Sequence, residues 1–150
     1  MEERFKLFTL LITDLFKNIK RLRTEEMAKY DLKSIHLSCL HYIHIESSIS
    51  LKELCVFCRD DKANVSRSIK TLIARGYVVT LPEENGKFAL TEEGIALTEK
   101  LEKKINSVLQ KAGCGLDEKQ REIMYSGLSI INNNLFEIYE NYKEIGDTDE

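Results

Sequence analysis

The stretch that decides the fold reads Asp61-Lys62-Ala63-Asn64-Val65-Ser66-Arg67-Ser68-Ile69-Lys70-Thr71-Leu72-Ile73-Ala74-Arg75-Gly76. It predicts one helix with a defined start and end. The carboxylate of Asp61 can accept hydrogen bonds from the free N–H groups of the first turn, and its negative charge suits the positive end of the helix dipole. Gly76 lies where a left-handed residue commonly ends a helix.

This predicted helix has two distinct faces. Its apolar residues recur at steps of three and four and form one face: Val65, Ile69, Leu72 and Ile73. The opposite face carries Lys62, Asn64, Ser66, Arg67, Lys70 and Thr71. Such side chains contact phosphates, and Asn, Ser and Arg can also read base edges in a major groove. Many surface helices that bind nothing also have a basic face, so the neighbouring segments have to support the DNA interpretation.

Composition restricts the kinds of partner. The chain has 150 residues, 43% of them hydrophobic and 31% charged, which is typical of one globular domain. The formal net charge is −3, whereas residues 59–75 hold five basic and two acidic residues. Any DNA contact is therefore expected to be a local basic patch. Neither a signal peptide nor a membrane-spanning apolar run is evident, so we expect a cytoplasmic protein with no membrane partner and four reduced cysteines.

Long amphipathic helices are expected at both ends of the chain. Residues 3 to about 22 place apolar residues in a heptad-like seam: Phe5, Phe8, Ile12, Leu15, Ile19 and Leu22. Residues 24–33 are polar and predict a turn. Helices are also expected from Thr91 to about Ala112 and from Asp117 onward, the last with a second heptad-like seam and an acidic, frayed tail from Glu137. Packing against a second chain and burial in the chain's own core both explain these seams.

The middle of the chain predicts a winged helix-turn-helix. A helix is expected at 34–46, and Ser50-Leu51-Lys52-Glu53 is a capping box that opens a short helix before the turn at Arg59 and Asp60. A β-branched run at 77–81 predicts one strand, residues 87–90 return as the second, and the turn between them ends in Asn85-Gly86, a hairpin signal. A hairpin directly after a helix-turn-helix is a wing.

The sequence contains two patterns that resemble metal or redox sites, and we interpret both as structural. Cys55 and Cys58 have the spacing Cys-x-x-Cys, but the sequence offers no second pair of zinc ligands and no strand before them, so we expect them to face the core. His36, His41 and His44 place no pair four residues apart on one helix face, which favours solvent or polar-pocket histidines over a metal site. No cofactor is expected.

Several of these segments resemble the MarR (multiple antibiotic resistance regulator) family of winged-helix transcription factors. They are Ser50-Leu51-Lys52-Glu53-Leu54-Cys55, Asp61 to Arg67, Leu72 to Val78, and Leu90-Thr91-Glu92-Glu93-Gly94. The resemblance covers about residues 5–142. It implies a mainly α fold with a small β-hairpin wing, forming one domain of residues 1–150 with a winged core at about 32–91 and dimerisation helices at about 3–22 and 92–142. It further implies an obligate homodimer with a recognition helix at 61–75, and a repressor that releases DNA when an aromatic acid binds or a cysteine is oxidised.

This chain departs from the family pattern in its wing and its cysteines. Family wings usually carry Asp-x-Arg near the tip, whereas this tip reads Glu83-Glu84-Asn85-Gly86-Lys87 and leaves Lys87 as the only candidate for a DNA contact. Peroxide-sensing members use a cysteine in the first helix, and this chain has none before Cys39. We therefore expect a small ligand, rather than metal or oxidation, to set the regulatory state.

The sequence thus predicts a sequence-specific DNA-binding regulator, a ligand-responsive repressor acting as a homodimer, and not an enzyme, because no catalytic constellation is evident. The expected DNA-binding residues are Lys62, Ala63, Asn64, Ser66, Arg67, Lys70 and Lys87. A small aromatic ligand is expected to contact Phe8, Phe16, Tyr30, His36, Leu40 and His41, which otherwise simply fill the core. The alternative is a winged-helix protein–protein interaction module that has lost DNA binding, for which the acidic pI and the short wing argue.

Overall fold

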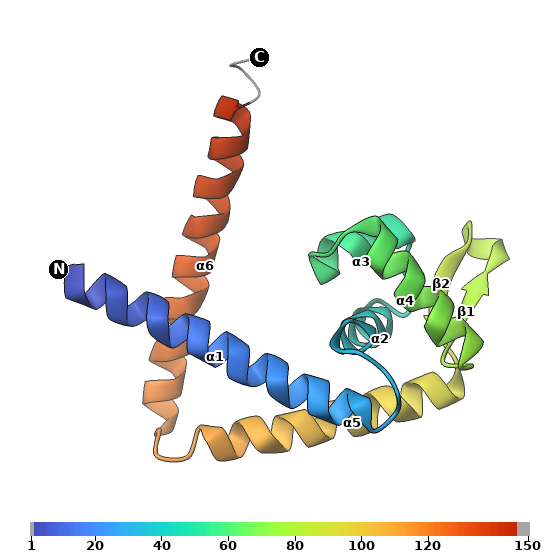
Figure 1. Ribbon diagram of the computed structural model, residues 1–150, viewed down its shortest axis with the longest axis horizontal. Coiled ribbons are helices and arrows are strands. Elements are labelled where there is room, and N and C mark those ends of the chain that lie inside the picture. Colours follow the sequence, from blue (N-terminus) through green and yellow to red (C-terminus); the bar gives the residue numbers. More distant parts are fainter. Residues whose placement is uncertain (1, 147–150) are drawn as a thin grey trace. The chain divides into compact units, whose positions relative to one another are not determined.

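A computed structural model describes the backbone of residues 2–146 and the side chains of residues 3–142. In chain order the elements are α1 (Glu2–Ala28), α2 (Ser34–Glu46), α3 (Leu51–Cys58), α4 (Lys62–Ala74), β1 (Val78–Leu81), the 3-10 turn η1 (Pro82–Glu84), β2 (Lys87–Leu90), α5 (Glu92–Ala112) and α6 (Glu118–Gly146) (Figure 1). The predicted fold class is confirmed: helices dominate, and the two strands form one hairpin. Internal contacts divide the chain into two compact units between Val108 and Leu109.

The first helix is longer than its apolar seam predicts. It continues to Ala28, so the prediction of a turn over residues 24–33 is wrong for its first half. Met27, in the last turn of α1, is fully buried, and this burial favours helix over the polar local sequence. The chain reverses only after Met27, whose carbonyl accepts hydrogen bonds from Tyr30 and Leu32, and Asp31 has a positive φ of 54°.

The helix-turn-helix forms where its capping residues predict it. Ser50 Oγ accepts the N–H of Glu53 at 3.2 Å, while Glu53 Oε2 accepts the N–H of Ser50 at 2.9 Å, so the predicted capping box is confirmed. These hydrogen bonds from Ser50 also lower the pKa of the Glu53 carboxyl. The short α3 ends at Cys58, its C-cap Arg59 takes a left-handed φ of 50°, and α4 begins three residues after Arg59, at Lys62.

The wing is a two-stranded antiparallel hairpin. Val78 pairs with Leu90 and Leu81 with Lys87. Its turn follows the Asn-Gly signal, since Asn85 and Gly86 both adopt left-handed φ values, 57° and 75°. An isolated bridge between Ile49 and Phe88 ties the wing to the residues just before α3.

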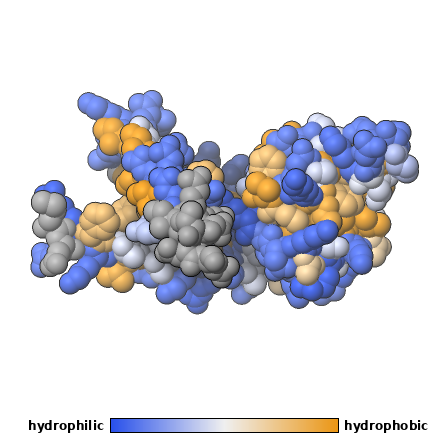
Figure 2. All heavy atoms as spheres, turned by 90° about the horizontal axis from the view of Figure 1, so that it is seen from above, coloured by the Kyte–Doolittle hydropathy of each residue, from blue (hydrophilic) through white to orange (hydrophobic). Residues whose placement is uncertain are grey.

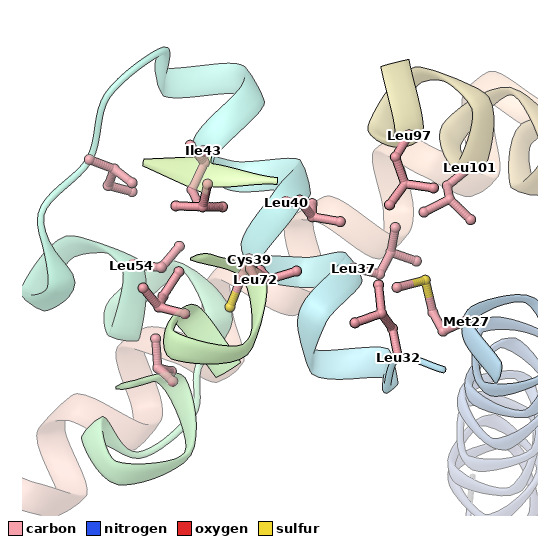
Figure 3. Close-up of a cluster of buried hydrophobic side chains, with 14 residues drawn as sticks. Met27, Leu32, Leu37, Cys39, Leu40, Ile43, Leu54, Leu72, Leu97 and Leu101 are labelled. Carbon is pink, nitrogen blue, oxygen red and sulfur yellow. The ribbon is translucent and has the colours of Figure 1, made fainter. Parts of the chain in front are cut away.

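One hydrophobic core holds the helix-turn-helix, the hairpin and the start of α5 together (Figure 3). Its buried hydrophobic residues among the described part are Met27, Leu32, Leu37, Cys39, Leu40, Ile43, Ile49, Leu54, Val65, Ile69, Leu72, Val78, Leu97 and Leu101. Figure 3 shows Met27 of α1 lying with Leu37 of α2 and Leu101 of α5. This core fixes α4 on a rigid support.

Glycine at position 94 is required where the first turn of α5 passes the backbone of Tyr77, the residue before β1. Thr91 Oγ1 accepts the Gly94 N–H at 3.0 Å and caps α5. A Cβ on Gly94 would lie 2.0 Å from the carbonyl oxygen of Tyr77, closer than any two such atoms approach. The close backbone contact gives a physical reason for the glycine in Leu90-Thr91-Glu92-Glu93-Gly94.

The last helix also starts as predicted but ends later. Asp117 Oδ1 accepts the Gln120 N–H at 2.8 Å, and Gln120 Oε1 accepts the Asp117 N–H at 2.9 Å. α6 continues to Gly146, so the helical backbone extends into the tail for which fraying was predicted. The remaining tail, 147–150, lies outside the described residues.

Large apolar side chains are exposed along α1 and along α6. Figure 2 shows orange, apolar residues among blue, hydrophilic ones on the face that it draws. On α1 they include Phe5, Leu7, Leu10, Leu11, Leu15 and Phe16. On α6 they include Ile123, Ile130, Leu135, Phe136, Ile138 and Tyr142. Among the described residues, no helix has both the length and the apolar character needed to cross a membrane.

Candidate nucleic-acid interface and a neighbouring cavity

The start of α4 is fixed by two consecutive aspartates. Asp61 Oδ1 accepts the N–H of Asn64 at 2.8 Å, which confirms Asp61 as the predicted N-cap. Asp60 bridges the turn and the helix, because Oδ1 accepts the Asp61 N–H at 2.8 Å and Oδ2 accepts the Asn64 side-chain amide at 2.9 Å. Asn64 is therefore half-buried and held in place by Asp60 before any partner is present.

The exposed face of α4 contains most of the predicted DNA-binding residues. Lys62, Ala63, Arg67 and Lys70 are exposed, and Ser66 is half-buried. Ala63, Arg67 and Lys70 follow one another at steps of four and three, so they lie on the same side of the helix. Ala63, one turn before Arg67, adds only a methyl group to this side of the helix.

The buried face differs from the predicted one at a single edge. Val65, Ile69 and Leu72 are buried as expected, but Ile73 is 38% exposed and Ser68 is buried instead. At 100° per residue, Ser68 lies closer than Ile73 to the centre of the stripe formed by the three buried residues. Ser68 tolerates burial because its hydroxyl donates to the carbonyl of Asn64 at 2.8 Å.

Basic residues from outside α4 border its exposed face. A groove of about 450 Å³ separates α4 from the start of α2, and its walls include Arg67, Thr71, Lys33 and His36. Lys33 is exposed and was not among the predicted contact residues. The pKa of His36 is lowered by burial and by the nearby positive charge of Lys33.

Arg75 serves a different purpose from Arg67 and Lys70. Its Nη2 donates to Asp31 Oδ2 at 2.6 Å, and its Nη1 donates to the carbonyl of Tyr30 at 3.3 Å. These bonds join the end of α4 to the turn after α1. An exposed ion pair of this kind contributes on the order of 0–1 kcal/mol, so its main effect is to orient the side chain.

The wing presents little positive charge. Lys87 is half-buried and lines a groove of about 760 Å³ with Glu53 of α3 and Lys52, where its charge contributes to lowering the pKa of Glu53. The tip carries exposed Glu83 and Glu84, and Glu84 accepts a hydrogen bond from Ser48 at 2.6 Å.

A second cavity, of about 320 Å³, lies between α1, α2 and α5. Its lining residues are Ile19, Arg23, Leu37, Ser38, His41, Tyr42, Glu102, Ile105 and Asn106. Arg23 Nη2 donates to Ser38 Oγ at 2.6 Å, and Arg23 Nε is buried without a hydrogen-bond partner among the described groups. Burial also lowers the pKa of Arg23. Across the cavity, His41 Nδ1 lies 2.6 Å from Glu102 Oε1.

The six predicted ligand-binding residues do not meet in one cavity. His41 lines the cavity just described, whereas His36 lines the groove beside α4. Leu40 is fully buried in the core, and the half-buried Tyr30 packs against that core with Lys100 5.7 Å from its ring centre. On α1, Phe8 is half-buried and Phe16 is exposed.

The histidines and cysteines are dispersed with respect to metal binding. In the part of the chain that the structure describes, no three His, Cys, Asp or Glu side chains are placed to hold one metal ion. His36 Nδ1 instead accepts the Lys33 N–H at 2.7 Å. Cys39 is buried, and Cys55 and Cys58 are half-buried against the core, with all cysteines in the thiol form.

Sequence reasoning missed the polar groups of the α1–α2–α5 cavity. Arg23 appears in the sequence only as part of a basic run, and Glu102 is 61 residues from its partner His41. No local pattern connects such residues, because the packing of three helices brings them together. The basic residue Lys33 carried a weak signal, since it directly precedes the predicted second helix.

Comparison with known proteins agrees with this fold. Residues 30–87 match the model of the MarR family. A MarR transcriptional regulator from Methanosarcina mazei Go1 superposes with a TM-score of 0.78 at 24% identity, covering 89% of this chain and 92% of that one. A MarR-family transcriptional regulator from Silicibacter pomeroyi gives 0.74 at 17% identity, covering 83% and 86%. Wild-type MarR from E. coli, in its apo form, gives 0.69 at 21% identity, covering 82% and 94%.

These matches confirm the resemblance to the MarR family and the winged helix-turn-helix fold of its transcriptional regulators. No curated protein matches the sequence significantly. At these sequence identities the solved structures establish the fold alone.

Proposed function

We propose that this chain, whose winged helix matches the MarR family, is a sequence-specific DNA-binding transcriptional regulator and not an enzyme. The observation that carries the proposal is the face of α4, on which Ala63, Arg67 and Lys70 are exposed. The capped N-terminus and the buried stripe hold this face rigidly, as a helix that enters a major groove requires. Arg67 would read a base edge, while Lys70 and Lys62 would contact phosphates.

The remaining predicted contact residues take different parts in this proposal. Ser66 and Asn64 lie beside the exposed face. The side-chain amide of Asn64 already donates a hydrogen bond to Asp60, so Asn64 would contact DNA either while keeping this bond or after exchanging it. Lys87 would reach the DNA backbone from the wing only after leaving the neighbourhood of Glu53. Lys33, across the groove from Arg67, is a further phosphate contact that we add on the basis of its position.

We also propose that the regulator is a homodimer that acts as a repressor in the cytoplasm. The exposed apolar residues of α1 and α6 form more uncovered apolar surface than a monomeric domain usually presents. Association with a second copy through these helices would cover that surface and place two α4 helices about one DNA turn apart.

The cavity between α1, α2 and α5 is suited to bind a small regulatory ligand. Its wall combines apolar Ile19, Leu37 and Ile105 with the unpaired Nε of Arg23 and the pair His41–Glu102. Arg23 could bind the carboxylate of a small aromatic acid, and the apolar wall its ring. A ligand with different affinities for two states typically shifts DNA binding by about 1–3 kcal/mol.

The decisive test is a salt-titrated binding assay with the DNA upstream of the protein's own gene. Arg67→Ala is expected to weaken specific binding by about 1–3 kcal/mol, because a base contact is lost. Lys70→Ala should weaken binding to all sequences alike and make the salt dependence shallower. Lys103→Ala removes one exposed positive charge from α5 and is the matched control, which should bind like the unaltered chain.

An interaction module that has lost DNA binding is the second candidate. The observation that favours it is the acidic wing tip, where Glu83 and Glu84 are exposed and Lys87 is half-buried. If Arg67→Ala and Lys70→Ala both keep the affinity of the unaltered chain, with circular dichroism showing intact helices, the DNA proposal is refuted and this second function is supported.

A further inference from the structure

The groove between the start of α2 and α4 contains hydrogen-bond donors that have no partner. Its volume is about 450 Å³, and the apolar part of its wall comes from Ala28, Leu32 and Ile35. The polar side chains of its wall are those of Asp31, Lys33, His36, Asn64, Arg67, Ser68 and Thr71. They divide into side chains that are bonded within the chain and side chains that are not.

Four of these polar side chains already form hydrogen bonds within the chain: those of Asp31, Asn64, Ser68 and Thr71. Asp31 is the one acidic residue among those that line the groove, and its carboxylate accepts Arg75 Nη2 at 2.6 Å. By contrast, no hydrogen bond or ion pair within the described side chains involves Lys33 Nζ, the Arg67 guanidinium or His36 Nε2. The groove therefore has unused polar atoms on both of its walls.

The unused nitrogen of His36 is a donor. Nδ1 of the ring accepts the Lys33 N–H at 2.7 Å, so Nδ1 carries no proton. Burial and the nearby charge of Lys33 lower the pKa of His36, which favours the neutral ring. A neutral imidazole that has no proton on Nδ1 carries it on Nε2. Since His36 lines the groove and is only 6% exposed, this N–H is available to a group bound in the groove and little accessible to bulk water.

The charges around this N–H favour an anion. Lys33 and Arg67 are both exposed and lie on opposite walls of the groove. The first turn of α2 contains no acidic residue, so no side chain of that turn neutralises the positive end of the helix dipole. The oxygens of an ionised phosphate accept hydrogen bonds and donate none, and charged donors bind them strongly. Such a group matches a site that offers donors alone.

We propose that this groove is an oxyanion site in which His36 Nε2–H, Lys33 and Arg67 together hold one phosphate group of the DNA backbone. The inference rests on the proposed function, because Arg67 belongs both to the exposed face of α4 and to the wall of the groove. A guanidinium has enough N–H groups to contact a phosphate and a base edge at once. The contact of His36 fixes the position of α4 on the duplex and strengthens binding to every sequence alike.

The oxyanion site is tested first without DNA. Inorganic phosphate is titrated, at constant ionic strength against chloride, into protein whose histidines are labelled with nitrogen-15. The Nε2–H resonance of His36 should shift and saturate, while His44, which lies on the same helix outside the groove, should not respond. Lys33→Ala and Arg67→Ala should each raise the phosphate concentration at half-saturation about threefold. No response of His36, or equal responses of His36 and His44, would overturn the site.

Two variants of equal shape separate the donor of His36 from its structural role. Gln and Glu at position 36 both accept the Lys33 N–H, as in a capping box. Gln also offers an N–H to the groove, whereas Glu offers none and adds a negative charge. His36→Gln should bind DNA within about threefold of the unaltered chain, and His36→Glu at least about tenfold more weakly, for operator and unrelated duplexes alike. His44→Glu adds the same charge to α2 outside the groove and should bind like the unaltered chain. Equal losses for His36→Gln and His36→Glu would refute the donor role.

The DNA backbone as the source of the phosphate is tested with duplexes that carry one neutral methylphosphonate each. At one position per half-site, the neutral group should weaken binding of the unaltered chain but strengthen binding of His36→Glu, because it removes the repulsion between two negative charges. If circular dichroism shows that His36→Glu has lost its helices, Lys33→Ala replaces it, and the effect at that position should shrink.

The two tests distinguish this inference from the function on which it rests. If His36 responds to phosphate but the protein binds no duplex, the proposed function has failed and the oxyanion site stands. If the pattern of sensitive phosphates is the same in the unaltered chain and in the variant, the assignment to the DNA backbone is wrong.

Discussion

The winged core and the outer helices use apolar residues in opposite ways. All described buried hydrophobic residues lie between Met27 and Leu101, whereas residues 3–22 of α1 and 118–142 of α6, the outer helices, contain no fully buried side chain among those described. Yet both regions have apolar residues at helical spacing. In the core, neighbouring elements of the same chain cover them, and in the outer helices they remain exposed. An apolar seam therefore predicts that a helix will bury a face, but not against which chain.

The largest expected effect concerns the core itself. Leu54 is fully buried, so Leu54→Ala should lower the free energy of unfolding by about 2–5 kcal/mol through lost burial and a residual cavity. Leu10→Ala in α1, where the side chain is 62% exposed, is the matched control. Urea denaturation below the dimerisation concentration measures both. Equal decreases in the free energy of unfolding for the two variants would contradict the difference between the two regions.

A second comparison uses glycine in both regions. Gly94→Ala should cost about 3 kcal/mol, because its Cβ would collide with the carbonyl of Tyr77. Gly127→Ala in α6 meets no atom within 4 Å, so it should stabilise the helix by up to about 1 kcal/mol. Thermal unfolding followed by circular dichroism tests the pair. Destabilisation by Gly127→Ala only at concentrations where dimers form would instead place this glycine in the dimer contact.

The third prediction asks what covers the outer helices. If a second chain buries Leu15, Leu15→Glu should weaken the dimer by about 2 kcal/mol or more, which is roughly 30-fold in dissociation constant. Asn18→Glu adds the same charge at an exposed polar position of α1 and should leave the dimer intact. Light scattering should change from about twice 17.4 kDa toward 17.4 kDa for Leu15→Glu alone. A monomeric unaltered chain would refute the homodimer.

The smallest expected effect is a pH dependence located in the winged core. The pKa of His36 is lowered in the folded protein by burial and by Lys33. The unfolded chain therefore binds the proton first as the pH falls below about 6.5, so folding stability decreases on acidification. His36→Gln keeps an acceptor for the Lys33 N–H and should flatten the loss of melting temperature between pH 7 and 5. Lys33→Gln should reduce it in part, and an unchanged slope in both would contradict this origin.

Local signals predicted α4 and the hairpin well. Asp61, the Ser50–Glu53 capping box, Gly76 and Asn85-Gly86 each satisfy or redirect backbone groups within a few residues, and they fall where the sequence placed them. The prediction for the end of α1 was wrong because burial against residues distant in sequence holds Met27 in the helix. Local helix propensity does not depend on such contacts.

The candidate sites depend on longer-range contacts to different degrees. The sequence alone determined most of the residues of α4 that face away from the core, because helical periodicity fixes the direction of each side chain, and it misplaced only Ile73 and Ser68 at the edge of the buried face. Only the tertiary structure decided that Arg23, His41 and Glu102 line one cavity. Periodicity orders residues along one element, whereas the placement of two elements depends on how whole faces pack together, which no short stretch of sequence specifies.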